Sequence, residues 1–144
     1  MRGRSNRMHL WLPVVAAISM LVLTGGGSLA AAVQPKAAGG TCSPNGTKLS
    51  ITSFDSKFDK KCLAAPANQA FTIDFTNLDR GIPHNVAIYQ DQTASKTLFK
   101  GELIDGPGKT TYSVQGLSAG TFFFRCDPHP DMNGTFIVGN PPPS

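Results

Sequence analysis

Short runs in which apolar and polar residues alternate follow one another between residues 47 and 138. The clearest run covers residues 70–76, where Phe71, Ile73 and Phe75 alternate with polar side chains. A period of two residues is typical of a β-strand with one buried face. No long stretch of the sequence places apolar residues at i, i+3, i+4 and i+7, as an amphipathic helix requires. We therefore expect an all-β fold.

The spacing of these runs indicates the architecture. Turn-forming segments separate them at residues 77–81, 105–108 and 117–120. Seven or eight short strands in about 100 residues favour an antiparallel β-sandwich or a small barrel. The nine Phe residues can fill its core. We expect strands at residues 47–54, 70–76, 84–89, 97–103 (the weakest), 110–114, 120–126 and 134–138.

The N-terminus has the three parts of a secretory signal peptide. Arg2, Arg4 and Arg7 precede an apolar run over residues 8–24, and a segment of small residues follows. We predict a signal peptide over residues 1–32, cleavage after Ala32, and export to the periplasm or the extracellular space. An uncleaved membrane anchor is the alternative, but the uninterrupted apolar core is shorter than the roughly 20 residues that span a bilayer.

Removal of this segment changes the charge of the chain. The full sequence carries a formal charge of +4, whereas residues 33–144 hold ten Lys and Arg against nine Asp and Glu. A nearly neutral domain does not favour nucleic-acid binding. We divide the remaining chain into a flexible lead-in (33–46), one domain (47–139) and a proline-rich tail (140–144).

A metal-binding pattern lies between the last two predicted strands. Cys126, His129 and Met132 follow one another with two residues between each, and His84 opens an earlier strand. One thiolate, two imidazoles and a weak axial thioether are the ligands of a trigonal copper site. A tight turn directs the three loop ligands towards one point, while a strand fixes the remote His.

Each of these residues also has an ordinary interpretation. Cys126 alone would suit an apolar core, the two histidines would suit loops, and Met132 would fill a gap. Together they account for every His and Met after residue 32 and for one of the three cysteines. This combination favours the metal site over the separate structural interpretations.

Two segments resemble the blue-copper cupredoxins, namely PHNV at residues 83–86 and CDPHPDM at 126–132. Within the plastocyanin-like group, the short loop with Pro on both sides of its His is most similar to that of amicyanin. The resemblance implies a Greek-key β-sandwich, one type 1 copper per chain and one-electron transfer. It also implies that His84, Cys126 and His129 are strong equatorial ligands and that Met132 is a long axial ligand.

The resemblance assigns roles around the metal as well. Asn85 resembles the family Asn that ties the two ligand loops together, and Pro128 has no N–H to donate towards the Cys126 sulfur. The exposed edge of His129 would pass the electron at a docking rim. This rim would include Ile82, Pro83, Pro128 and Pro130, and the sequence departs from the family by adding Asp127 and Asp131 to it.

Cys42 and Cys62 remain outside this pattern. In an exported chain a disulfide between them is the favoured interpretation. A second metal site is the alternative, although no His or Met is left to complete it.

The expected function is that of an exported, monomeric electron carrier between two redox proteins. We expect no enzymatic activity and no small-molecule substrate. The alternative is a copper chaperone or store, which usually needs exposed clusters of Met or His. A copper oxidase or nitrite-reducing enzyme would need more histidines than the two that remain.

Overall fold

The computed structural model describes residues 42–140. The predicted signal peptide, the cleavage site after Ala32 and most of the lead-in and tail lie outside these residues. Within the described part, no helix has the length and apolar character needed to cross a membrane.

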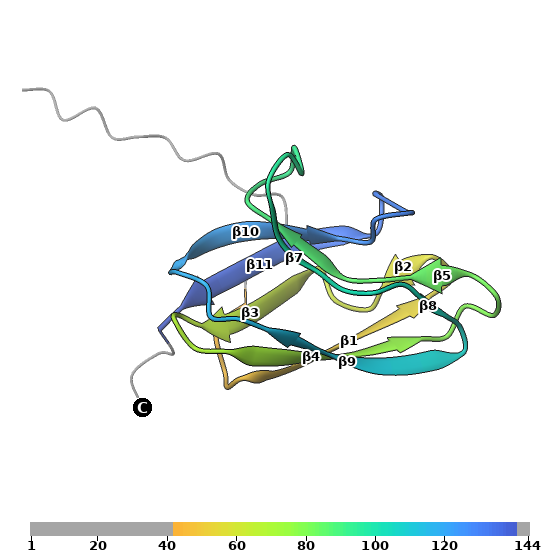
Figure 1. The fold of residues 1–144 in the computed structure, drawn as a ribbon, viewed down its shortest axis with the longest axis horizontal. Coiled ribbons are helices and arrows are strands. Elements are labelled where there is room, and N and C mark those ends of the chain that lie inside the picture. Colours follow the sequence, from red (N-terminus) through yellow and green to blue (C-terminus); the bar gives the residue numbers. More distant parts are fainter. Residues whose placement is uncertain (1–41, 141–144) are drawn as a thin grey trace, which may run out of the picture. The chain divides into compact units, whose positions relative to one another are not determined.

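Eleven β-strands and no α-helix occur in residues 42–140 (Figure 1). Eight of them have three residues or more, which agrees with the seven or eight strands expected. The strands are β1 (Lys48–Phe54), β2 (Lys57–Phe58), β3 (Cys62–Pro66), β4 (Phe71–Asn77), β5 (Pro83–His84), β6 (Ala87–Tyr89), β7 (Thr97–Lys100), β8 (Ile104–Asp105), β9 (Gly108–Val114), β10 (Gly120–Arg125) and β11 (Asn133–Gly139).

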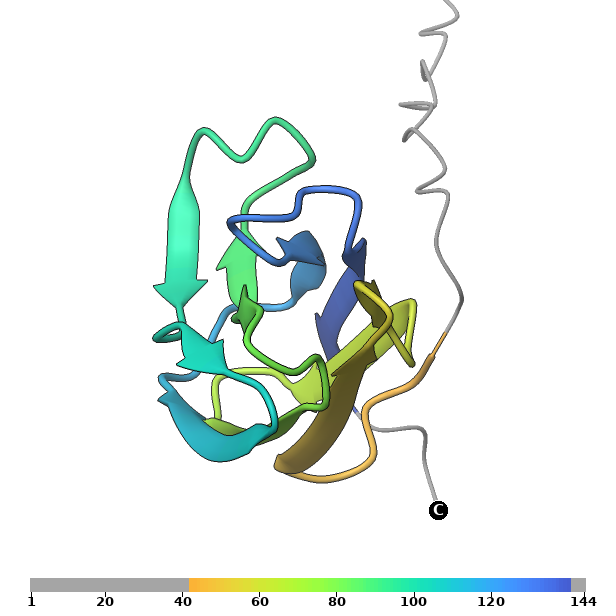
Figure 2. The ribbon, with the colours of Figure 1, turned by 90° about the vertical axis from the view of Figure 1, so that its right-hand side faces the viewer.

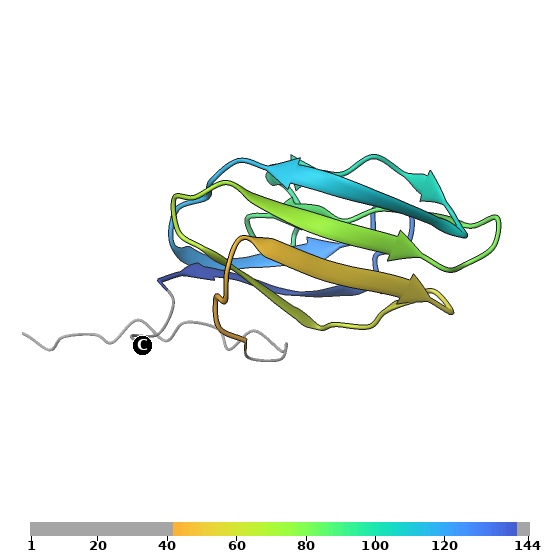
Figure 3. The same cartoon turned by 90° about the horizontal axis from the view of Figure 1, so that it is seen from below.

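Two sheets pack face to face as a sandwich (Figures 1 and 3). The first has the order β2-β1-β4-β9, the second has the order β3-β11-β10-β6-β7, and β5 and β8 form a separate ribbon. The expectation of purely antiparallel sheets is wrong, because β1 pairs with β4 and β3 pairs with β11 in parallel. The chain leaves the first sheet to form β3 before it returns at β4, and such a crossover makes a parallel pair possible.

Aromatic rings from both sheets form the core. Phe71 stacks on Phe136 with ring centroids 5.4 Å apart, and Phe58 lies 5.7 Å from Phe124. Both pairs join one sheet to the other and bury large apolar areas. The alternation predicted for β4 is also present, since its apolar side chains are buried. The Phe residues do not all fill the core, because Phe54 is 65% exposed.

Five predicted strands agree with the structure to within two residues at each end, and two differ by more. The strand expected at 84–89 is interrupted at Asn85 and Val86, because the Asn85 side chain bonds to neighbouring loops. The strand expected at 97–103 ends at Lys100. β3 was not predicted, because its Ala residues and terminal Pro have low β-propensity. Leu63 and Ala65 are nevertheless buried, and pairing with β11 alone makes β3 an edge strand of the second sheet.

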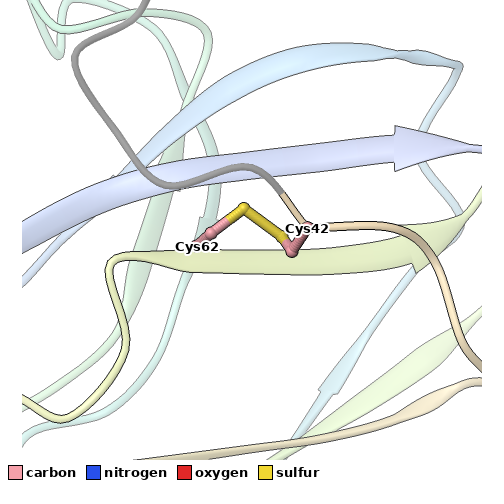
Figure 4. Close-up of a disulfide and its surroundings, with 2 residues drawn as sticks. All are labelled: Cys42 and Cys62. Carbon is pink, nitrogen blue, oxygen red and sulfur yellow. A yellow bond between two sulfur atoms is a disulfide. The ribbon is translucent and has the colours of Figure 1, made fainter.

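A disulfide joins Cys62 of β3 to Cys42, the pairing that the sequence favoured (Figure 4). The S–S distance is 2.08 Å, and the two residues are separated by 20 positions in the sequence. The disulfide ties the start of the described chain to the edge of the second sheet.

The β1–β2 turn, the β4–β5 loop and the β8 segment gather at one end of the sandwich, together with the loop that joins β10 to β11 (Figures 1 and 2). Backbone hydrogen bonds hold this end together, including Leu78 N to Ser53 O and Gly81 N to Gly106 O. Of the predicted ligands, Cys126, His129 and Met132 lie in the β10–β11 loop, and His84 lies in β5.

Candidate metal centre

Three of the predicted ligands converge in the structure. The donor atoms of His84, Cys126 and His129 all lie within 4.8 Å of one another. The Cys126 sulfur is 3.5 Å from His84 Nδ1 and 3.7 Å from His129 Nδ1. One soft thiolate with two imidazoles fits a copper ion, which sulfur and nitrogen donors bind well.

His84 comes from the β5–β8 ribbon and is fully buried. Its Nδ1 faces the Cys126 sulfur, and its Nε2 lies 2.9 Å from the Asp79 carboxylate. Burial lowers the pKa of the imidazole, and the hydrogen bond to Asp79 opposes this shift without reversing it. The lowered pKa favours the neutral ring, the state in which imidazole binds a metal.

Cys126 directly follows β10 and is also fully buried. It is the free cysteine of the described residues. Burial raises the pKa of its thiol, while the backbone N–H groups of Asn85 and His129 act in the opposite direction. Pro128 is exposed and has no N–H, so the N–H donors to this sulfur are those of Asn85 and His129.

The loop from Cys126 to Met132 closes on itself. Cys126 N donates to Met132 O at 2.9 Å, and Met132 N donates to His129 O at 2.9 Å. These two bonds bring the three predicted loop ligands into a single tight turn. The Met132 side chain is 1% exposed and lies in the same core cluster as Cys126.

Asn85 connects this loop to the loops around His84. Its Oδ1 accepts a hydrogen bond from Asp127 N at 2.9 Å, and its Nδ2 donates to Gly101 O at 2.9 Å. The side chain is fully buried, so these bonds have no competition from water. Both ligand-bearing loops are thereby fixed relative to each other.

Asp127, which was predicted to lie at the docking rim, is half-buried and makes contacts with several neighbouring segments. Its carboxylate accepts hydrogen bonds from the Tyr89 hydroxyl and from Asn85 Nδ2, and it lies 3.2 Å from Lys100 Nζ. Burial raises the pKa of this carboxyl, but these hydrogen bonds and the Lys100 charge outweigh it, so the net pKa is lowered. The side chain is 17% exposed, and its contacts give it a bridging position.

The remaining rim residues lie at the surface. Ile82, Pro130 and Asp131 are exposed, and Pro83 and His129 are half-buried. Three further large apolar residues, which were not predicted as part of the rim, are exposed as well, namely Phe54, Leu78 and Leu103. Phe54 lies on the face of β1 opposite to buried Leu49 and Ile51, and Leu78 and Leu103 lie in loops, where no periodic pattern applies.

Two buried polar residues near His84, Asn77 and Asp79, were also not predicted as part of the site. Asn77 uses all of its side-chain hydrogen-bonding groups, donating to Ile82 O and Ile104 O and accepting from Ser53 Oγ and Asp79 N. Asp79 contacts the ring of His84. In the sequence both residues belong to a turn, where Asn and Asp are usually exposed.

A buried Cys and two His thus converge at one end of a two-sheet sandwich. The chain belongs to the cupredoxin-like domain family, whose model matches residues 17–138. The particular likeness of the ligand loop to that of amicyanin stays a prediction from the sequence.

Plastocyanins are among the relatives. The chain is 30% identical to the chloroplastic plastocyanin of Chlamydomonas reinhardtii over 96 residues, which cover 64% of this chain and 61% of that protein. It is 41% identical to plastocyanin B'/B'' of Nicotiana tabacum over 73 residues, 46% of this chain and 69% of the relative. The chain thus spans about three fifths of the length of the algal relative.

Solved structures share the fold at low sequence identity. A reduced auracyanin of Roseiflexus castenholzii matches with a TM-score of 0.59 and 21% identity, covering 65% of this chain and 97% of that one. Auracyanin A of Chloroflexus aurantiacus, described as a "blue" copper protein, matches with a TM-score of 0.57 and 21% identity, covering 66% and 100%. The all-β sandwich expected from the sequence is confirmed.

Proposed function

We propose that this protein is an exported type 1 copper protein that carries one electron at a time between two redox proteins. The observation that carries the proposal is the convergence of one buried thiol and two imidazole nitrogens within 4.8 Å. His84, Cys126 and His129 would hold the copper as equatorial ligands, and Met132 would be its weak axial ligand.

The chain contributes a site that resists rearrangement. Copper supplies a one-electron Cu(I)/Cu(II) couple when bound. The closed Cys126–Met132 loop and the Asn85 bridge hold the donor atoms in one geometry. A site that changes little between oxidation states favours fast electron transfer, because little structure must reorganise.

A docking surface is part of this proposal. His129 is the half-buried ligand, whereas His84 and Cys126 are fully buried. Its ring edge is therefore the shortest route from the site to a partner protein. Exposed Ile82 and Pro130 would form an apolar rim, with half-buried Pro83 beside them and Asp131 adding a negative charge.

The location and assembly are also proposals. The signal-like N-terminus and the disulfide both suit an exported protein. We expect a monomer whose donor and acceptor are redox proteins, and no enzymatic activity or small-molecule substrate. The alternative of a copper chaperone or store fits less well, because two of the ligands are fully buried.

Addition of one equivalent of Cu(II) to the metal-free protein tests the site. We expect an intense blue thiolate-to-copper absorption band in the wild type and none in Cys126→Ser. Cys42→Ser together with Cys62→Ser is the matched control, because it removes two sulfurs outside the site and should keep the colour. A colourless, weakly bound metal in the wild type would contradict the carrier and favour copper handling.

A further inference from the structure

Asp79 has a buried carboxylate whose contacts lead from the metal centre to the molecular surface. The residue is 8% exposed. One carboxylate oxygen, Oδ1, accepts a hydrogen bond from Asp55 N at 2.6 Å. The other, Oδ2, lies 3.1 Å from Ser56 N and 2.9 Å from His84 Nε2. Among residues 42–140, His84 is the one side chain with a nitrogen within salt-bridge distance of this carboxylate, and the contact is an ion pair only when the ring is protonated.

The two backbone donors belong to the turn between β1 and β2. Asp55 and Ser56 both have positive φ angles, 52° and 50°, as the central residues of a type I′ hairpin turn do. This conformation directs their consecutive N–H groups at the Asp79 carboxylate. Because both residues are exposed, the anchor of the carboxylate lies at the protein surface.

The backbone of Asp79 is held in place from the other side. Its N–H donates to Asn77 Oδ1 at 3.0 Å, and its carbonyl oxygen accepts from Ile82 N at 3.1 Å. Gly106 packs directly against the same carbonyl group, where any larger side chain would collide. The carboxylate is therefore fixed in position whether or not His84 binds a metal.

We propose that Asp79 is a positioning residue for His84: anchored by the Asp55–Ser56 turn, its carboxylate holds the imidazole proton on Nε2 and leaves Nδ1 free to bind copper. A neutral imidazole carries one proton, and a carboxylate oxygen accepts it from the nitrogen it faces. Nδ1 then presents its lone pair towards the Cys126 sulfur, 3.5 Å away.

The part of this inference that concerns copper rests on the proposed function. A carboxylate partner makes a ligating His more basic and fixes its ring orientation, and loss of such a partner typically costs about 10- to 100-fold in metal affinity. Its negative charge also stabilises Cu(II) over Cu(I), because the oxidised site is the more positive one. Asp79 should therefore lower the reduction potential of the site.

The tautomer can be measured in the metal-free wild-type protein. Long-range ¹H–¹⁵N correlation spectra should place the His84 proton on Nε2. The amides of Asp55 and Ser56 should exchange slowly with solvent although their residues are exposed. A His84 proton on Nδ1, or fast exchange of both amides, would overturn the proposal. This readout needs neither copper nor a variant, so it is independent of the proposed function.

Variants then test the consequence for the metal. Asp79→Asn and Asp79→Ala should weaken Cu(II) binding by about 10- to 100-fold in competition with a chelator, and Asp79→Asn should raise the potential. Asp105→Asn is the matched control, because it removes a negative charge from the β5–β8 ribbon without a contact to His84. If Asp79→Asn and Asp105→Asn have the same copper affinity and the same reduction potential, the positioning role of Asp79 is refuted. This outcome is independent of the blue band of the wild type, which tests the proposed electron carrier.

Discussion

Asn85 and Asp127, 42 residues apart in the sequence, are joined by a 2.9 Å hydrogen bond from the Asp127 backbone N–H to the Asn85 side-chain oxygen. Asn85 follows His84 and Asp127 follows Cys126, so this bond lies one residue away from two of the proposed ligands. It couples the loop that carries one ligand to the loop that carries the others.

Asn85→Ala should therefore destabilise the fold and loosen the site. The change leaves Gly101 O and Asp127 N without their partner in a buried place, which costs about 1 to 3 kcal/mol for each unsatisfied group. Denaturant unfolding of the metal-free protein measures the loss. The control is Asn45→Ala, at an exposed position, and equal stability of the two variants would contradict the bridging role of Asn85.

The charges near the ligand loop should tune the potential. Asp127→Asn and Asp131→Asn should both raise it, because each carboxylate favours the more positive oxidised site. The larger rise is expected for Asp127, since Asp127 is 17% exposed, whereas exposed Asp131 is screened by solvent and salt. Lys100→Met removes the positive partner of Asp127 and should lower the potential. Cyclic voltammetry measures all three, and no change or a fall in the two Asp variants would contradict this effect.

Met132→Leu should keep the blue colour and raise the potential. The thiolate of Cys126 produces the colour, whereas the axial thioether adjusts the balance between the oxidation states. The swap conserves volume at a fully buried position, so the stability should change by less than about 1.5 kcal/mol. Leu63→Met is the control elsewhere in the core and should leave the potential unchanged. An unchanged potential in Met132→Leu would show that this sulfur is no ligand.

Loss of the Cys42–Cys62 disulfide should lower the free energy of unfolding by about 3 kcal/mol, the usual value for a closed loop of this length. Unfolding of the Cys42→Ser, Cys62→Ser double variant measures this change, and the blue spectrum should persist. Thiol titration of the denatured wild type should find one reactive thiol before reduction and three afterwards, because the chain has three cysteines. Three thiols before reduction would exclude the disulfide.

Features that depend on neighbouring residues were predictable from the sequence. The alternation in β4 fixes which of its side chains are buried, and the Cys126–Met132 spacing places three candidate ligands in one turn. His84 could be assigned to the site because few other metal-binding side chains remain after the N-terminal segment.

Features that depend on packing between distant segments were not predictable. Leu63 and Ala65 of β3 are buried only because β11 runs beside them. Asp79 looks like an ordinary turn residue until folding brings it to the β1–β2 turn and His84. Asp127 was expected at the surface, and its contacts with Tyr89 and Lys100 depend on residues 27 to 38 positions away.

Redox cycling of the copper-loaded wild-type protein tests the central claim most directly. The visible spectrum and the bound copper content are followed through reduction by ascorbate and reoxidation by ferricyanide. An electron carrier with the His84, Cys126 and His129 ligand set should lose its blue band on reduction and recover it in full, with one copper retained per chain. Loss of copper on reduction, or absence of the blue band from the start, would contradict it.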